Sequence, residues 1–327
     1  MRDLVSDFTK HLEKAVEIGA KTQFNNTNKK FSNVLISGLG GSGIGGTIAS
    51  QLVAQEIKVP VIVNKDYSIS EFVDQNTLFI ACSYSGNTEE TLYALEAAEK
   101  KGAEIVCITS GGQIEKIATE KGYNTIIIPG GLPPRAAFGL SFPQLFYVLN
   151  QYSLISKEFE TGISDAIKSI NAEGSEIRQQ AKYIAGCLLD TIPVIYTDAS
   201  FEGVGVRFRQ QVNENSKMLC WHNAIPEMNH NELVGWAGGS EALSVIIFRN
   251  ETDYSRSQKR VEINKEIIKR HTSNIVEVFS KGHSAMERTL YLIHFGDWIS
   301  VELADLKQID ATEVDVITGL KDELSKI

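Results

Sequence analysis

Short apolar runs alternate with helix-like stretches along most of the chain. In the first half the runs come at regular intervals, separated by helix-like stretches such as Thr47–Ala54 and Glu89–Lys101. Short apolar runs of this length, bounded by turn residues, predict buried strands. The five runs are Asn33–Ile36, Val61–Val63, Leu78–Ala81, Ile105–Ile108 and Thr125–Ile128. Strands that alternate with helices in this way predict βαβ units and a parallel sheet.

The second half of the chain repeats this alternation. It follows a helix expected at Phe138–Ser156 and a polar, helix-forming connection at Lys157–Gly186. The later elements are strands at Pro193–Thr197, Ala242–Phe248 and Ile275–Phe279, a glycine-containing turn at Phe201–Val206, and helices at Arg207–Asn215 and Met286–Leu306. We therefore predict an α/β chain with two domains, residues 1–155 and 156–327, each a mainly parallel sheet flanked by helices.

Composition and charge narrow the range of partners. The 327 residues are 43% hydrophobic, which is enough for two mid-sized domains, and the net charge is −9. Such an acidic chain disfavours nucleic acid and anionic membranes, and no run of Lys and Arg forms a basic patch. The N-terminus is charged and helix-like, unlike a signal peptide, and no apolar run is long enough to span a bilayer. The four cysteines form no CxxC pair, so we expect a reducing, cytoplasmic environment.

A glycine-rich loop, SGLGGSGIGG at residues 37–46, follows the first strand and opens a helix. Its GxGxxG spacing at Gly38, Gly40 and Gly43, with Asp66 after the second strand, leaves a nicotinamide site open, although a lone GxGxxG is a weak signal. A close packing turn with no ligand is the plainer alternative. Glycine-rich turns after first strands usually face a pocket, so we favour a ligand site.

A second loop, SYSGNTEET at residues 83–91, is rich in hydroxyl groups. Ser83, Ser85 and Thr88 lie between a buried strand and a helix expected to begin at Glu89. Hydroxyl groups beside the amides of a helix N-terminus favour an anion, and the oxygens of a phosphate monoester accept from both. The loop has no lysine, so it is not a nucleotide P-loop. The alternative is an ordinary polar helix cap with the serines in water.

Together the two loops resemble the sugar isomerase domain, a phosphosugar-binding module with a flavodoxin-like fold. The resemblance rests on GLGGSGIGG and SYSGNTEETL. It implies that Ser83, Ser85 and Thr88 hold the phosphate of the sugar, and that the backbone at Gly41 and Ser42 lies beside the substrate. Enzymes and transcriptional regulators both use this module. A non-catalytic phosphosugar sensor therefore stays open, as does a nicotinamide oxidoreductase.

Three further segments resemble the bifunctional phosphoglucose/phosphomannose isomerases. They are PGGLPPRAAFG at 129–139, VNENSK at 212–217 with PEMNHNELVGW at 226–236, and ITGLKDEL at 317–324. The resemblance runs nearly the whole length of the chain. It implies an enzyme that interconverts fructose 6-phosphate with glucose 6-phosphate and mannose 6-phosphate through a cis-enediolate. It also implies no metal, no organic cofactor, and a homodimer with shared active sites.

Two residues would carry the proton transfer that this resemblance implies. Glu214 resembles the base that moves the proton between adjacent carbons. Arg135 follows two prolines that stiffen the backbone, and it resembles the residue that stabilises the enediolate. Each residue has a non-catalytic alternative. Residue type alone would make Glu214 a glutamate on the surface of a helix, and Arg135 a surface arginine in a salt bridge.

Two more residues would open the sugar ring. His230 resembles the ring-opening histidine, lent by the neighbouring subunit, and Lys321 resembles the lysine that acts with it. His222 and Lys307 are their competitors in the sequence.

A threonine near the C-terminus resembles the residue that permits mannose 6-phosphate as a substrate. This residue is Thr312, in DATEVDVITGLK at 310–321. The segment departs from the family's pattern at Ala311 and Glu313, where prolines are usual. These two departures affect the shape of the loop that carries Thr312, and the dual specificity depends on that shape.

Overall fold

The structure is a computed structural model that describes residues 1–25, 28–324 and 326. Its contacts divide the chain into two compact units. The N-terminal unit comprises Ser6–Ala172 and Lys281–Tyr291, and the C-terminal unit comprises Met1–Val5, Glu173–Ser280 and Leu292–Ile327. Two long helices, α7 (Glu158–Leu188) and α11 (Ala285–Leu306), contribute residues to both units. The predicted division into domains at residues 1–155 and 156–327 stays a prediction.

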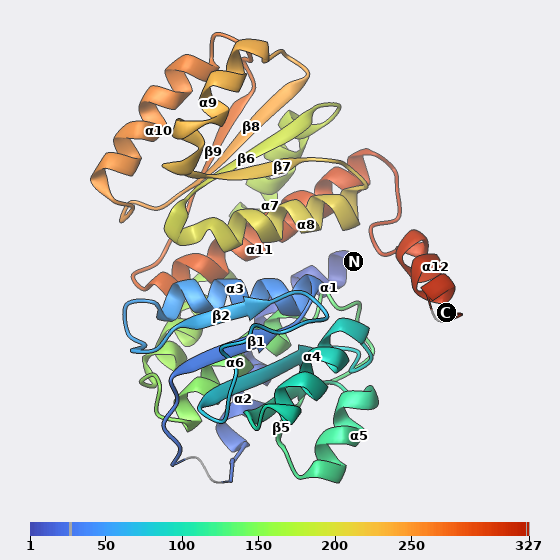
Figure 1. The fold of residues 1–327 in the computed structure, drawn as a ribbon. Helices are drawn as coiled ribbons and strands as arrows, with labels where there is room; N and C mark the ends of the chain where they lie inside the picture. The colour runs from blue at the N-terminus through green and yellow to red at the C-terminus, as the bar shows by residue number, and fades with distance from the viewer. Residues whose placement is uncertain (26–27, 325, 327) are drawn as a thin grey trace. The chain divides into compact units, whose positions relative to one another are not determined.

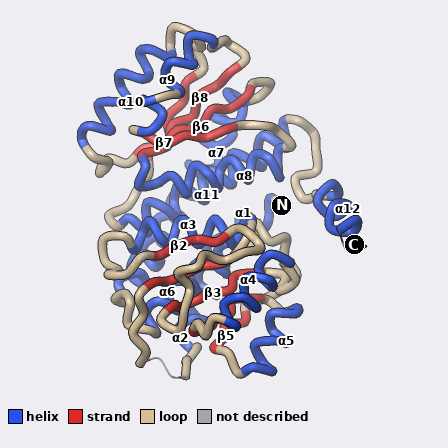
Figure 2. Tube along the Cα trace, in the orientation of Figure 1, coloured by secondary structure: helices blue, strands red, loops and turns tan. Residues whose placement is uncertain are grey.

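The N-terminal unit contains a five-stranded sheet whose strands all run parallel, in the order β2-β1-β3-β4-β5 (Figures 1 and 2). The strands are β1 (Asn33–Ser37), β2 (Val61–Asn64), β3 (Thr77–Ser83), β4 (Glu104–Thr109) and β5 (Asn124–Ile127). They lie where the five apolar runs predicted them. The runs were readable because strands covered on both faces, as in the centre of this sheet, have few polar residues.

Helices cover both faces of this sheet. On one face, α4 (Glu89–Lys100) and α5 (Gly112–Lys121) pack against β3 and β4, where Phe79 and Cys107 are buried. On the other face lie α3 (Gly40–Val53) and α6 (Phe138–Gln151), and α2 (Phe8–Lys21) packs on α6. The close approach of α3 to the sheet needs a glycine, because a β-carbon at Gly46 would lie 2.9 Å from Cγ2 of Ile36.

The strand order places one edge of this sheet where ligands bind. The chain proceeds outward from β1 to β2 in one direction and from β1 through β3 to β5 in the other. In doubly wound folds, ligands bind outside the carboxyl ends of the strands at such a reversal point. The glycine loop that follows β1 and the hydroxyl loop that follows β3 flank this point, because β1 pairs directly with β3.

The C-terminal unit contains a second parallel sheet, of four strands in the order β7-β6-β8-β9 (Figure 1). The strands are β6 (Ile192–Asp198), β7 (Trp221–Ile225), β8 (Leu243–Arg249) and β9 (Ile275–Phe279). One face buries Val194, Tyr196 and Ile247 against α10 (Ser255–Ile268) and the turns around Met228 and Trp236. On the other face lies α8 (Glu202–Ser216), whose Phe208 packs on Phe248 and, through Gly296, on α11. Both units are therefore α/β with mainly parallel sheets flanked by helices, as the sequence predicted.

In the second half, one local prediction is wrong and one strand was not predicted. The segment 201–206 is not a turn, because α8 begins at Glu202 and includes Gly203 and Gly205. Gly205 lies on the side of α8 that packs on the sheet, where a β-carbon would lie 3.0 Å from Cγ2 of Thr197. Strand β7 was not predicted, since WHNAI has only a short apolar end. The polar connection predicted at 157–186 is the 31-residue helix α7.

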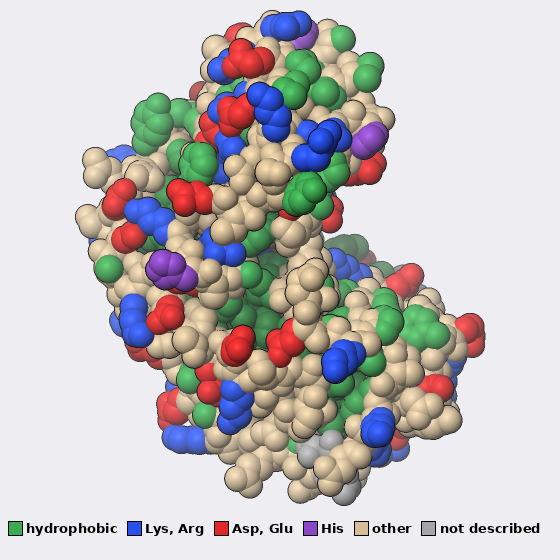
Figure 3. Space-filling model, turned by 90° about the vertical axis from the view of Figure 1, so that its left-hand side faces the viewer, with side chains coloured by type: hydrophobic (Ala, Val, Ile, Leu, Met, Phe, Trp, Pro, Cys, Tyr) green, Lys and Arg blue, Asp and Glu red, His purple; other side chains and the backbone are tan. Residues whose placement is uncertain are grey.

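The surface drawn in Figure 3 carries acidic and basic side chains interspersed, with no large area of one sign. Among the helices in the described part of the chain, none is long and apolar enough to cross a membrane.

Candidate phosphosugar site

Two hydroxyl groups face each other where β3 ends. Ser83 is the last residue of β3 and is buried, and its Oγ lies 2.8 Å from Oγ1 of Thr88. The backbone amide of Gly86 also donates to Ser83 Oγ, at 3.1 Å. Thr88 is the N-cap residue of α4, but its side chain does not cap the helix. The hydroxyl pair therefore lies beside the positive end of a 12-residue helix, which is the arrangement that favours an anion.

The shape of this loop is fixed by a neighbouring turn. Gly86 has φ +67, and a β-carbon there would lie only 1.7 Å from the carbonyl oxygen of Gly111. The side-chain oxygen of Asn87 accepts from the backbone amide of Gln113 at 3.0 Å. Ser85 is exposed, and its Oγ accepts from the amide of Asn87 at 3.3 Å. Only glycine fits at position 86, so the loop has little freedom to change shape.

The glycine loop meets both the hydroxyl loop and the segment that carries Arg135. A β-carbon at Gly38 would lie 2.7 Å from the carbonyl oxygen of Cys82, so the two loops touch through their backbones. A β-carbon at Gly41 would lie 3.3 Å from the carbonyl oxygen of Pro134 and 3.6 Å from Cα of Arg135. Arg135 itself is buried, with 4% of its surface exposed. These contacts bring the glycine loop, the hydroxyl loop and the arginine segment together.

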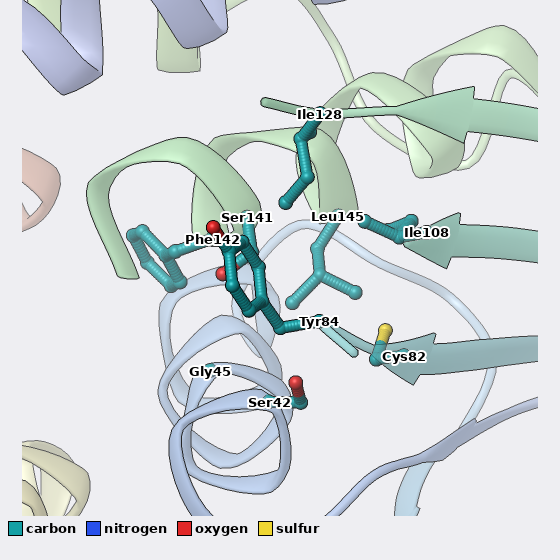
Figure 4. Close-up of a pocket in the computed structure, with 9 residues that line it drawn as sticks. All are labelled: Ser42, Gly45, Cys82, Tyr84, Ile108, Ile128, Ser141, Phe142 and Leu145. Carbon is teal, nitrogen blue, oxygen red and sulfur yellow. The ribbon is translucent and has the colours of Figure 1, made fainter. Parts of the chain in front are cut away.

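A small cavity lies between these segments, with Ser42, Cys82 and Tyr84 in its wall (Figure 4). Its volume of about 10 Å³ is at the lower limit for holding one water molecule, so it is too small for a sugar. The hydroxyl of Tyr84 donates to the carbonyl of Pro129 and accepts from the amide of Leu132, both at 3.0 Å. Tyr84 thus ties the hydroxyl loop to the segment that leads to Arg135. Tyr84 is not among the site residues predicted from the sequence, although an aromatic residue between two serines was a visible signal.

In the C-terminal unit, Glu214 lies in the last turn of α8 and is half-buried. The two residues that follow it fix this turn on α11. The amide of Asn215 donates to Oγ of Ser300 at 2.9 Å, and the hydroxyl of Ser216 donates to the carbonyl of Ser300 at 2.7 Å. Because Asn215 and Ser216 are buried, these bonds are shielded from water and hold the turn in one place.

A buried ion pair anchors the same two helices closer to their middle. Arg207 donates to Asp297 at 2.6 Å, and the amide of Gln211 donates to the other carboxylate oxygen at 2.8 Å. Burial raises the pKa of Asp297, and the charge of Arg207 opposes this shift. The helix that carries Glu214 is therefore held to α11 along its length by polar contacts.

The two candidate histidines lie in different settings. His230 ends the short 3-10 helix Glu227–His230, which follows a cis peptide bond at Pro226, and its side chain is exposed. His222 is a half-buried residue of β7, with Nε2 3.7 Å from Glu202. Burial lowers the pKa of His222, and the charge of Arg209 lowers it further. His230 is thus the histidine more open to a substrate, but the choice between them stays a prediction.

Glu232 fixes the turn that carries His230. Its carboxylate accepts from Nε1 of Trp221 at 3.2 Å, from the amide of Asn223 at 2.8 Å and from the hydroxyl of Tyr196. Because its carboxylate accepts from three donors, Glu232 has a structural role. This role accounts for a glutamate two residues after His230.

The predicted C-terminal residues lie beyond α11. Thr312 is exposed, its backbone amide donates to Oδ1 of Asp310 at 2.7 Å, and its Oγ1 accepts from the amino group of Met1 at 3.2 Å. Lys321 is exposed on α12 (Asp315–Leu324), a helix with no buried residue. Its competitor Lys307 donates to the carbonyl of Ser216 at 2.9 Å, so its ammonium is engaged at the end of α8.

The structure therefore brings some of the predicted site residues together and leaves others on separate segments. Six lie at the carboxyl edge of the N-terminal sheet, at the end of β3 or in the segments that follow β1, β3 and β5: Gly41, Ser42, Ser83, Ser85, Thr88 and Arg135. In the C-terminal unit, Glu214 and the segment around Thr312 are linked through Lys217, whereas His230 and Lys321 lie on separate segments. The functional roles of these residues stay predictions.

Comparison with known proteins defines the class. The model of the SIS (sugar isomerase) domain matches residues 28–135, and that of the bacterial phospho-glucose isomerase C-terminal SIS domain matches residues 177–324. A solved structure from Thermus thermophilus has a TM-score of 0.78 at 17% identity, covers 99% of this chain and 88% of its own, and shows the fold.

Two curated relatives go further. The bifunctional phosphoglucose/phosphomannose isomerase of Caldicellulosiruptor bescii is 37% identical over 100% of this chain and 99% of its own length. The enzyme of the same name from Thermoplasma acidophilum is 38% identical over 90% of each chain. The chain therefore belongs to the family of bifunctional phosphoglucose/phosphomannose isomerases, and it is an enzyme of the isomerase class.

Proposed function

We propose that this enzyme interconverts fructose 6-phosphate with glucose 6-phosphate and with mannose 6-phosphate. The observation that carries the proposal is the paired hydroxyls of Ser83 and Thr88 at the start of α4, backed by a glycine loop that lies against the Arg135 segment. The names of the full-length relatives support the choice of hexose 6-phosphates.

The phosphate of the substrate binds at the start of α4. Its oxygens accept from the hydroxyls of Ser83, Ser85 and Thr88, and from amides at the helix N-terminus. Gly41 and Ser42 lie beside the sugar, and the absent side chain at Gly41 lets it approach the backbone. Hydroxyls and amides suffice to hold a phosphate monoester here without a lysine in the loop.

The chemical step is a proton transfer between C1 and C2. Glu214 removes the proton from C2 of the open-chain aldose, the electron pair forms a C1–C2 double bond, and the carbonyl oxygen takes the negative charge. Arg135 stabilises this enediolate with a charge that does not depend on pH. Return of the proton to C1, with transfer of the proton of the C2 hydroxyl to the negatively charged C1 oxygen, gives the ketose. No metal or organic cofactor takes part.

The cyclic sugar must open before this step. His230 and Lys321 exchange the proton between the ring oxygen and the C1 hydroxyl, and His230 is contributed by the second subunit of a homodimer. Either C2 epimer gives the same enediolate, so one base can serve glucose 6-phosphate and mannose 6-phosphate. Thr312 leaves room for the second epimer.

A coupled assay on the purified protein tests the proposal. Fructose 6-phosphate is supplied and glucose 6-phosphate formation is followed, with and without EDTA, and the assay is repeated from mannose 6-phosphate. We expect turnover of both sugars at rates that EDTA does not change. Phosphosugar binding without turnover would support a non-catalytic sensor instead, and loss of activity in EDTA would replace the metal-free mechanism with a metal-dependent one.

A further inference from the structure

Lys217 ends the helix that carries Glu214. It is the C-cap residue of α8 and adopts the left-handed conformation, with φ 49 and ψ 46. Its backbone amide donates to the carbonyl of Val212, which closes the last turn. Helix C-termini commonly end in this conformation, but glycine or asparagine usually occupies it. A lysine in this conformation costs backbone free energy, so we expect its side chain to make a compensating interaction.

The ammonium group of Lys217 donates to three carbonyl oxygens. They belong to Glu214 at 2.8 Å, Asp310 at 2.8 Å and Glu313 at 2.7 Å. An ammonium has three N–H donors, so these bonds match its full capacity. Two of the acceptors lie 93 and 96 residues further along the chain. The side chain therefore connects the end of α8 to the segment 310–313.

A second lysine strengthens this connection from the other side. Lys307, three residues before the segment, donates to the carbonyl of Ser216 at 2.9 Å. Within the segment, the carboxylate of Asp310 accepts from the amide of Thr312 at 2.7 Å, and this bond is the main reason that the pKa of Asp310 lies below its usual value. The main chain of Thr312 is thus fixed on both sides by groups that Lys217 holds.

We propose that Lys217 is a positioning residue that sets the balance between the two C2 epimers. This inference rests on the proposed function, because that function assigns the roles of base to Glu214 and of specificity residue to Thr312. The C2 proton points to opposite sides in glucose 6-phosphate and mannose 6-phosphate, so the two sugars need different poses at one base. Lys217 holds the segment 310–313 where both poses fit.

The test compares four proteins: the wild type, Lys217→Met, Lys217→Arg and the control Lys269→Met. Methionine has nearly the length of lysine and the same backbone cost at this position, but it has no donor. Lys269 is the C-cap residue of α10 and pairs with Glu266 on the surface, so its replacement removes a lysine elsewhere in the same unit. For each protein, kcat and KM are measured for formation of glucose 6-phosphate and of mannose 6-phosphate from fructose 6-phosphate.

We expect Lys217→Met to lower kcat for the mannose reaction by about 10- to 100-fold, because a misplacement of about 1 Å can cost about 100-fold. The glucose reaction should fall by less than about threefold, and KM for fructose 6-phosphate should stay within about twofold, since the phosphate groups are unchanged. Lys217→Arg, which keeps the charge and the donors, should restore most of the mannose rate. Lys269→Met should match the wild type.

Hydrogen exchange gives a readout that does not depend on turnover. In Lys217→Met the amides of residues 310–314 should exchange faster than in the wild type, while those in the middle of α8 should not change. An unchanged epimer ratio in an active wild-type background, or an equal loss in both reactions, would overturn the inference and leave the proposed function intact. An inactive wild type would overturn the proposed function and this catalytic role together, and exchange would then show whether Lys217 still holds the segment.

Discussion

Replacing Gly86 by alanine perturbs the phosphate loop at the point where it is most constrained. Gly86 has φ +67, and an added β-carbon would lie 1.7 Å from the carbonyl oxygen of Gly111. Real β-carbon contacts closer than 3.0 Å are essentially never seen, so the loop and the turn must separate by more than 1 Å. Gly122 offers a matched control, since it has φ +71 but its β-carbon would meet nothing within 4 Å.

The expected size of the effect follows from these two differences. At Gly122 only the left-handed backbone is penalised, so Gly122→Ala should lower the free energy of unfolding by about 1–2 kcal/mol. Gly86→Ala has the same penalty and adds a steric clash of about 1–3 kcal/mol, which gives a loss of about 2–5 kcal/mol. A domain stable by about 5–15 kcal/mol remains folded in part, so binding can still be measured.

The assay follows thermal unfolding by circular dichroism and binding of inorganic phosphate by calorimetry. Gly86→Ala should lower the thermal midpoint more than Gly122→Ala and should weaken phosphate binding by about tenfold or more, because the donors move. Gly122→Ala should bind phosphate as the wild type does. Equal affinity in the two variants would refute the assignment of this loop to the phosphate, and equal midpoints would refute the steric argument.

Three further predictions concern buried groups. Burial lowers the pKa of His294 from 6.5 to about 3, so the unfolded chain gains a proton first as the pH falls, and stability drops below pH 6.5. His294→Gln should remove about 3 kcal/mol of the drop between pH 7 and pH 4 in urea unfolding, and an unchanged drop would contradict this. Asp297→Asn leaves the guanidinium of Arg207 buried without its counter-charge and should cost about 3–5 kcal/mol at pH 7, whereas a loss below about 1 kcal/mol would speak against the ion pair as an anchor. Burial raises the pKa of the Cys82 thiol and that of Cys107, the latter to about 12, so neither should react with a disulfide reagent at pH 8 before unfolding; native labelling found by peptide mapping would disprove this.

The parts of the fold that could be predicted are those with a strong local signal. In the N-terminal unit, β1, β3 and β4 are buried along nearly their whole length and appear in the sequence as apolar runs between glycine or polar turns. In the C-terminal unit, β7 lies at the edge of its sheet and is partly exposed, so Trp221–Ile225 is too polar to stand out. Gly205 suggested a turn because the contact that requires a glycine there, the close packing of α8 on β6, exists only in three dimensions.

In the candidate site, too, the features formed by sequence neighbours were predictable and the long-range contacts were not. The hydroxyl loop was predictable because Ser83, Thr88 and the helix that begins at Glu89 are neighbours in the sequence. The contact of Gly41 with the Arg135 segment joins residues far apart in the chain and is visible only in the structure. The same holds for Lys217, because no local sequence pattern indicates that it contacts residues 310 and 313.

Exchange of substrate protons with solvent tests whether Glu214 moves a proton between C1 and C2. The enzyme is incubated with glucose 6-phosphate in D2O, and the proton at C2 is followed by NMR. We expect deuterium to enter at C2 during turnover. Glu214→Gln should slow this entry by about 100-fold or more while phosphosugar binding persists. Near-normal turnover and near-normal exchange in Glu214→Gln would contradict this role of Glu214.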